Sequence, residues 1–345
     1  MLKRLVSTTL FFLLSIVITA HADTFTDAAG RTVTIPDKVN KVVAAGPPAA
    51  VLIYVLAPEK LAGWVKAPSA KDKDFLLPEA QKLPVLGRLT GKDGAANIEA
   101  IKKAKPDLVI DVGTVDPSYV ALANKVQKET GIPYVLIDGS LPKTMNALRQ
   151  VGDLLDVTDR ADKLATYVDE RFKDLAVAVE LTPEKNRPRI YYGRGPKGLQ
   201  TGSAGSINTE IIDMLGAKNV AASAGKAGLI DVTAAQVAGW NPDIILIEDA
   251  DFFKTIKTDP AWMSLKAVKD GKVFKAPGLP FGWFDSPPGV NRLMGLIWLE
   301  AIIYPKHFDL SDLRADIRDF YDEFYQVDLM DEDLEELFAD SSLKY

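Results

Sequence analysis

Short runs of Val, Ile and Leu alternate along the chain with longer helical runs. The short runs are bounded by Gly, Pro, Asn and Asp, a pattern typical of β-strands. The predicted strands are residues 41–45, 61–65, 108–112, 134–137, 189–192, 244–248 and 273–276. The predicted helices are residues 49–56, 98–104, 119–129, 159–180, 206–215 and 234–239. This alternation favours an α/β protein built on parallel sheets.

The longest helical pattern, residues 159–180, lies near the middle of the chain. Its apolar residues recur with a period of 3.6, which leaves one face polar. At about 1.5 Å per residue this helix would be roughly 33 Å long, close to the diameter of a domain. A helix, a Pro-Asp pair and a strand follow one another on both sides of it, at Pro106-Asp107 and again at Pro242-Asp243. We therefore predict two Rossmann-like lobes with central parallel sheets, joined by one long helix.

The N-terminal segment has the pattern of a cleavable signal peptide. Lys3 and Arg4 precede an apolar run at residues 10–18, and Ala20-His21-Ala22 provides a cleavage site. A membrane anchor is the alternative, but the apolar run is too short to cross a bilayer. The predicted organisation is a signal peptide at residues 1–22, an N-terminal lobe at 23–142, a helical connector at 143–182, and a C-terminal lobe with an acidic helical tail at 183–345.

The composition limits the chemistry of the site. The 345 residues include no cysteine and two histidines, and removal of the signal peptide leaves only His307. We therefore expect no disulfide, no thiol nucleophile and no bare transition-metal site, which needs several His and carboxylate ligands. The formal net charge is −6 and no basic stripe is present, so nucleic-acid binding is not expected. No nucleophile elbow, Walker loop or histidine-based triad occurs, and we predict no catalytic residue.

Loops that follow the predicted strands carry the candidate ligand-binding residues. Ligands of open α/β sheets bind beyond the carboxyl ends of the strands, so two facing lobes would enclose one ligand cleft. Arg194 could form paired hydrogen bonds to a carboxylate, a catecholate or an oxyanion, and the helix start after Ser206 favours negative charge. Aromatic side chains beside turns would cover the rim of a chelate or macrocycle. The candidates are Pro47, Pro48, Trp64, Arg88, Tyr119, Tyr192, Arg194, Ser206, Trp283 and Phe284.

Several segments spread along the chain carry a family resemblance. They are Phe25-Thr26-Asp27, Asn97-Ile98-Glu99, Pro106-Asp107-Leu108-Val109-Ile110, Thr201-Gly202 and Ser286-Pro287-Pro288 with Arg292. With these motifs the chain resembles the periplasmic substrate-binding proteins of ABC importers for iron-siderophores, haem and cobalamin. Residues 304–329 resemble an extension found in a longer subgroup of metal-chelate and molybdate or tungstate binders.

The resemblance implies one acidic docking residue on each lobe for the permease. Glu99 matches the position on the first lobe. The matching position on the second lobe is Ala235, which cannot form an ion pair. Either Asp231 takes its place or docking is asymmetric.

The resemblance also implies the function. The protein would capture a metal chelate in the periplasm, with a ferric siderophore as the first choice and haem or cobalamin behind it. It would deliver the ligand to an inner-membrane permease and its ATPase, as a monomer and without a cofactor. Binding of molybdate or tungstate through Arg194 is the alternative on the same fold. A periplasmic hydrolase is the alternative from another class.

Overall fold

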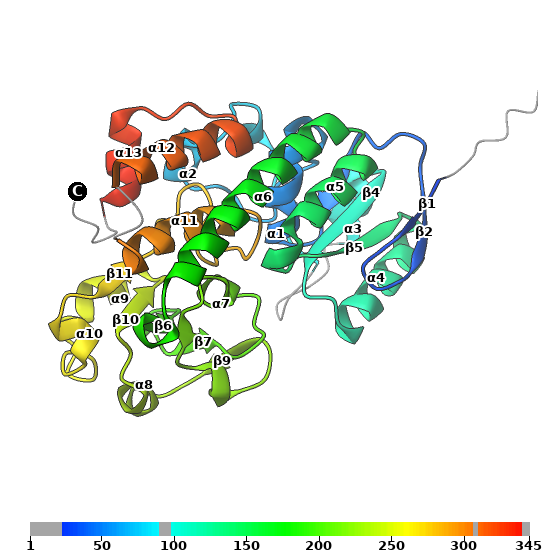
Figure 1. The fold of residues 1–345 in the computed structure, drawn as a ribbon. Coiled ribbons are helices and arrows are strands. Elements are labelled where there is room, and N and C mark those ends of the chain that lie inside the picture. Colours follow the sequence, from blue (N-terminus) through cyan, green and yellow to red (C-terminus); the bar gives the residue numbers. More distant parts are fainter. Residues whose placement is uncertain (1–22, 90–97, 306–309, 340–345) are drawn as a thin grey trace, which may run out of the picture.

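Two α/β lobes joined by a long helix make up the protein, which confirms the predicted fold class (Figure 1). The computed structural model describes residues 23–89, 98–305 and 310–339. Among these residues, no helix has the length and apolar character needed to cross a membrane. The predicted signal peptide and His307 lie outside the described residues.

The first lobe is built on a three-stranded parallel sheet in the order β3-β4-β5. Its strands are β3 (Val42–Ala44), β4 (Leu108–Gly113) and β5 (Tyr134–Asp138), and an antiparallel hairpin of β1 (Asp23–Thr26) and β2 (Thr32–Ile35) precedes them. The helices are α1 (Pro47–Leu56), α2 (Ala70–Asp74), α3 (Ile98–Ala104), α4 (Pro117–Thr130) and α5 (Thr144–Leu154). The strand predicted at 61–65 is reduced to two isolated bridges, from Leu61 to Val42 and from Trp64 to Val85.

Local sequence explains where the helices near the strand ends begin. Pro47 and Pro48 occupy the first turn of α1, where a missing N–H costs no intrahelical hydrogen bond. The Asp116 carboxylate accepts from the backbone N–H groups of Ser118 and Tyr119 and so caps α4. Gly131 ends that helix in the left-handed conformation, with φ of 73°.

The second lobe is built on a four-stranded parallel sheet in the order β11-β10-β6-β8. Its strands are β6 (Arg189–Gly193), β8 (Lys218–Asn219), β10 (Ile244–Ile247) and β11 (Val273–Lys275), with a small antiparallel pair of β7 (Gln200–Gly202) and β9 (Leu229–Asp231). The helices are α7 (Glu210–Met214), α8 (Ala234–Trp240), α9 (Ala250–Thr255) and α10 (Lys266–Lys269). Helix α7 starts later than predicted, because the Ser206 hydroxyl bonds to Asn208 within a turn before it.

The long helix α6 (Thr158–Leu181) runs from one lobe to the other, as predicted (Figure 1). The C-terminal helices are α11 (Arg292–Ile303), α12 (Leu310–Phe320) and α13 (Asp331–Phe338) (Figure 1). A π-helical turn at Tyr321–Tyr325 follows α12.

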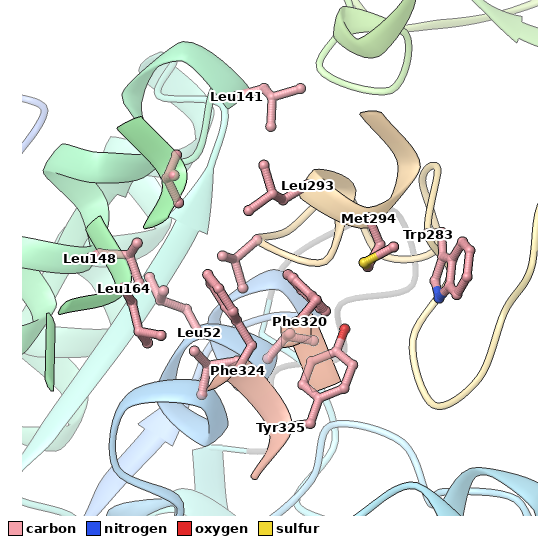
Figure 2. Packing of buried hydrophobic residues seen from close by; sticks show 14 of the residues in the cluster. Leu52, Leu141, Leu148, Leu164, Trp283, Leu293, Met294, Phe320, Phe324 and Tyr325 are labelled. Atoms are coloured by element: carbon pink, nitrogen blue, oxygen red, sulfur yellow. The ribbon is translucent and has the colours of Figure 1, made fainter. Parts of the chain in front are cut away.

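The acidic tail packs against the first lobe. The Tyr54 hydroxyl of α1 donates to the Tyr325 carbonyl at 3.0 Å, and Lys163 of α6 forms an ion pair with Glu323 at 2.6 Å. Figure 2 shows Phe324 beside Leu52 of α1, within one continuous buried cluster. The sequence grouped this tail with the second lobe, but its contacts reach α1 and α6, so one apolar core extends across both lobes. The domain boundaries themselves stay a prediction.

Candidate functional site

The candidate site lies beyond the carboxyl ends of the second lobe's parallel strands, where an open α/β sheet binds its ligands. Arg194 follows β6, and Glu248 follows β10. The loop between β11 and α11 contributes Asp285. We call Tyr192, Arg194, Glu248 and Asp285 the Arg194 cluster.

Acidic and amide groups hold the guanidinium of Arg194 in place. Its Nε lies 2.5 Å from the Asp285 carboxylate and 3.5 Å from the Glu248 carboxylate. Its Nη1 donates to the Gln200 side chain at 2.7 Å. Asp285 also accepts a hydrogen bond from the Asn208 amide. The Arg194 side chain is 17% exposed and that of Asp285 is fully buried, so Asp285 is the inner partner and Glu248, at 28%, the outer one.

Burial and charge set the protonation of the cluster. Burial raises the pKa of Asp285 to about 6, although Arg194 and the Asn208 hydrogen bond act in the opposite direction. Burial, reinforced by the charges of Asp285 and Glu248, holds the pKa of Tyr192 well above its usual value, so its hydroxyl remains a donor. Burial lowers the pKa of Arg194, but the two carboxylates more than offset this and raise it overall. The guanidinium is therefore charged at every physiological pH.

A second set of titratable groups lies in the first lobe near the end of β4. Asp111 is buried, and the Tyr134 hydroxyl donates to it at 2.9 Å. Burial raises the pKa of Asp111 to about 6, against the effect of that hydrogen bond. Tyr119 is half-buried at the start of α4, and burial together with the charge of Asp111 raises its pKa, while the charge of Arg88 lowers it. Arg88 and Tyr119, both predicted site residues, thus act on each other electrostatically.

Asp111→Asn should change the pH dependence of stability. Because the folded pKa of about 6 exceeds the ordinary aspartate pKa of 3.8, the wild-type protein loses stability as pH rises through this window. The variant lacks this loss, so its stability relative to wild type should rise by about 3 kcal/mol between pH 3.5 and pH 7. Urea unfolding at several pH values measures the difference. Asp74→Asn, at an exposed carboxylate of α2, is the matched control for the loss of one acidic group. A flat difference for Asp111→Asn would contradict the prediction.

The two lobes meet directly at the start of α1. Pro47 and Pro48 are half-buried there, and a Cβ placed on Gly289 would lie 3.5 Å from the Pro48 Cα. A cavity of about 20 Å³ lies between the lobes, lined among others by Gly139, Ser140 and Gly289. That volume is of the order of one water molecule. The structure therefore places these segments in contact.

Arg292 connects the lobes. Sequence reasoning included it in a family motif but did not select it as a site residue. It is 1% exposed. It donates to the Gly139 carbonyl of the first lobe and to the Ile207 carbonyl of the second, each at 2.6 Å. It also pairs with Glu210 at 2.8 Å, whose carboxylate in turn accepts from the Leu141 N–H of the first lobe at 2.7 Å. The sequence signal for this role was an arginine at the first position of a mostly apolar helix, since a buried charge requires partners.

The aromatic side chains predicted to form a rim around the ligand are buried in this structure. Trp64, Trp283 and Phe284 are 3%, 0% and 1% exposed. The Trp64 indole donates to the Ala80 carbonyl at 2.7 Å, and the Trp283 indole donates to the Tyr321 hydroxyl at 3.1 Å. In this structure these three side chains are core residues, and their contact with a ligand stays a prediction. The reason for the burial is packing by segments distant in sequence, as Tyr321 and Phe338 pack against Trp283.

Tyr192 and Ser206 are also buried, each at 1%. The Tyr192 ring packs on Phe284 with 4.3 Å between centroids, and the Tyr192 hydroxyl points to Asp285 at 3.4 Å. In this structure both side chains are buried behind the exposed part of the site, where Tyr192 contacts Asp285 and Ser206 bonds to Asn208. Their contact with a ligand stays a prediction, as it does for Pro47, Pro48, Arg88, Tyr119 and Arg194.

The architecture and these strand-end loops agree with the comparisons to known proteins. A family model described as periplasmic binding protein matches residues 57–278. The chain belongs to the periplasmic binding protein family.

Relatives of this periplasmic binding protein cover most of its length. It is 29% identical over 330 residues to the molybdate-binding protein MolA of Haemophilus influenzae, covering 88% of this chain and 90% of MolA. It is 28% identical over 191 residues to the Fe(3+)-citrate-binding protein YfmC of Bacillus subtilis, covering 54% and 58% of the two chains. A solved ABC transporter solute binding protein from Sulfurospirillum deleyianum superposes with a TM-score of 0.82 at 29% identity, covering 92% of this chain and 99% of the other.

The residues considered for permease docking lie on the surface of this periplasmic binding protein. The Glu99 side chain is 85% exposed on α3 and has a weak contact of 3.4 Å to Lys102. Asp231 and Ala235 are exposed at the end of β9 and on α8. Their role in docking stays a prediction. Within residues 23–89, 98–305 and 310–339, no group of three or more His, Asp or Glu side chains is arranged to hold a metal ion.

Proposed function

We propose that this periplasmic binding protein is the solute-binding component of an ABC importer and that its ligand is a small oxyanion of the molybdate or tungstate type. In this proposal the protein captures and delivers the ligand without chemical change. The observation that carries the ligand class is the geometry of Arg194. Its Nε pairs closely with the buried Asp285, whereas the outer carboxylate, Glu248, lies farther from the same nitrogen and is partly exposed.

An oxyanion can bind to such an arginine by replacing the outer carboxylate. Asp285 then keeps the guanidinium oriented, and an oxygen of the ligand takes the position of the Glu248 carboxylate. Charge-assisted hydrogen bonds from arginine to oxyanions are short and strong. The similarity to MolA along nearly the whole chain supports the same ligand class.

A large siderophore is less well supported than the sequence suggested. The aromatic side chains expected to cover it are buried, and the lobes meet across a very small cavity. A small ferric chelate is the second candidate, because part of the chain is similar to the Fe(3+)-citrate-binding protein YfmC. The cleaved signal peptide, the monomeric state and the partnership with a permease and ATPase belong to the same proposal.

A panel of ligands tests the proposal by thermal unfolding and titration calorimetry. Molybdate and tungstate should stabilise the protein, since a ligand at 100 times its Kd adds about 2.7 kcal/mol to the free energy of unfolding. Sulfate serves as the control oxyanion, and ferric citrate, haem, cobalamin and a ferric siderophore as the chelates. Stabilisation by ferric citrate without any response to molybdate or tungstate would replace the oxyanion by the second candidate. Turnover of generic esters would instead support a hydrolase.

A further inference from the structure

A groove of about 510 Å³ lies between the long helix α6 and the C-terminal helices α11 and α12. Its apolar lining includes Leu175 and Ala178 from α6, and Leu293, Leu296 and Ile297 from α11. The volume falls within the range of small-molecule sites in proteins. None of its lining residues belongs to the Arg194 cluster, so the groove is separate from the candidate site.

Apolar surface continues outward from the groove along α6. Val177 and Leu181 line its edge and are 56% and 61% exposed. Exposed apolar surface that continues from a groove is typical of a binding site. An occupant with an apolar body would bury them together with the groove floor.

The charge of the groove is negative. Asp174, Glu300, Asp312 and Asp316 line it, and Arg171 is the one cation among its lining residues. Arg171 is already engaged, because it pairs with Asp316 at 3.0 Å. The groove therefore carries three uncompensated acidic groups when all are ionised, which favours a cationic occupant and disfavours an anionic one.

Glu300 is the acidic group that an occupant would meet beside the apolar floor. It projects from α11, is about half-buried, and its carboxylate has no hydrogen bond or ion pair among the described residues. Burial, together with the charges of Asp174 and Asp316, raises its pKa to about 7, while Arg171 acts in the opposite direction. A buried carboxylate without a partner is costly unless a cation reaches it.

We propose that this groove is a second ligand site, which binds a small organic cation with an apolar chain, such as an alkylammonium ion. The ammonium group pairs with Glu300, and the chain lies on the leucine and isoleucine floor between α6 and α11. The cation and the apolar body are both required, because the groove offers charge and apolar area side by side.

Titration calorimetry with octyltrimethylammonium at pH 8, below its micellar concentration, tests this site. The wild-type protein should bind one equivalent. Tetramethylammonium has the charge without the chain, and octanoate has a chain with the opposite charge, so both should bind far more weakly. Glu300→Gln should weaken binding of octyltrimethylammonium about tenfold, the loss of one partly buried ion pair. Glu170→Gln removes the same charge from an exposed position of α6 outside the groove and should change nothing.

A second variant tests the groove itself. Ala315 is exposed on α12 and lines the groove, so Ala315→Trp should fill the groove, leave the fold intact and abolish binding. The proposal is overturned if the wild-type protein shows no saturable binding, if octanoate binds equally well, if Glu170→Gln weakens binding as much as Glu300→Gln, or if Ala315→Trp binds unchanged. Molybdate binding is measured in parallel, and its failure would bear only on the function proposed above.

Discussion

Arg292→Met will lower the free energy of unfolding by about 3–5 kcal/mol, the cost of removing one partner from a buried ion pair. Arg292 is 1% exposed and its partner Glu210 is 20% exposed at the side chain. The substitution leaves the Glu210 carboxylate without its cation. It also removes the donors to the carbonyls of Gly139 and Ile207, one in each lobe. Urea unfolding followed by tryptophan fluorescence measures the loss.

The same change should also weaken ligand binding, because Arg292 fixes the orientation of the lobes. Arg149→Met is the matched control: Arg149 pairs with Asp162 at the surface, with side chains 48% and 57% exposed. Such pairs contribute about 0–1 kcal/mol. A double variant, Arg292→Met with Glu210→Gln, should recover part of the stability, since no unpaired charge is left. If Arg292→Met lowers the free energy of unfolding no more than Arg149→Met does, the contacts of Arg292 between the lobes do not contribute to stability.

Arg194→Met should weaken oxyanion binding by about 30-fold or more, which corresponds to the roughly 2 kcal/mol or more lost when a partner of a buried charge pair is removed. Stability should fall as well, because Asp285 stays buried and loses its cation. Since the pKa of Asp285 is raised in the folded state, the stability loss should be largest above pH 6 and shrink as pH falls towards 4.

Glu248→Gln is the matched variant at the outer, more exposed partner of the same guanidinium. It removes the competing outer carboxylate and leaves Asp285 in place, so oxyanion affinity should rise. Calorimetric titration of both variants with molybdate separates the two roles. Equal losses in Arg194→Met and Glu248→Gln would contradict ligand binding at the outer side of Arg194. Unchanged affinity in Arg194→Met would remove this residue from the site.

The sequence was sufficient for the architecture because local patterns encode it. The 3.6-residue period of α6 predicted its length within two residues at each end, and the apolar runs located every strand of the two parallel sheets except β8, which has two residues. The predicted helical tail packs on the core, since Leu313, Ile317, Phe320 and Phe324 are all fully buried. The strand predicted at 61–65 failed because its residues pair only at isolated positions.

The site was less predictable, because it depends on contacts between segments far apart in the chain. Tyr321 packs against Trp283, and Arg194 pairs with Asp285 from another loop. The local hydrophobic periodicity does not indicate either contact. Arg292 joins Gly139, which lies 153 residues earlier.

Thus the sequence by itself determined the two-lobed α/β fold, its family resemblance, the scarcity of histidine and the absence of cysteine. Only the tertiary structure decided which candidate residues are accessible. Burial is a property of what packs on a side chain, and for Trp64, Trp283 and Phe284 the covering segments come from elsewhere in the chain.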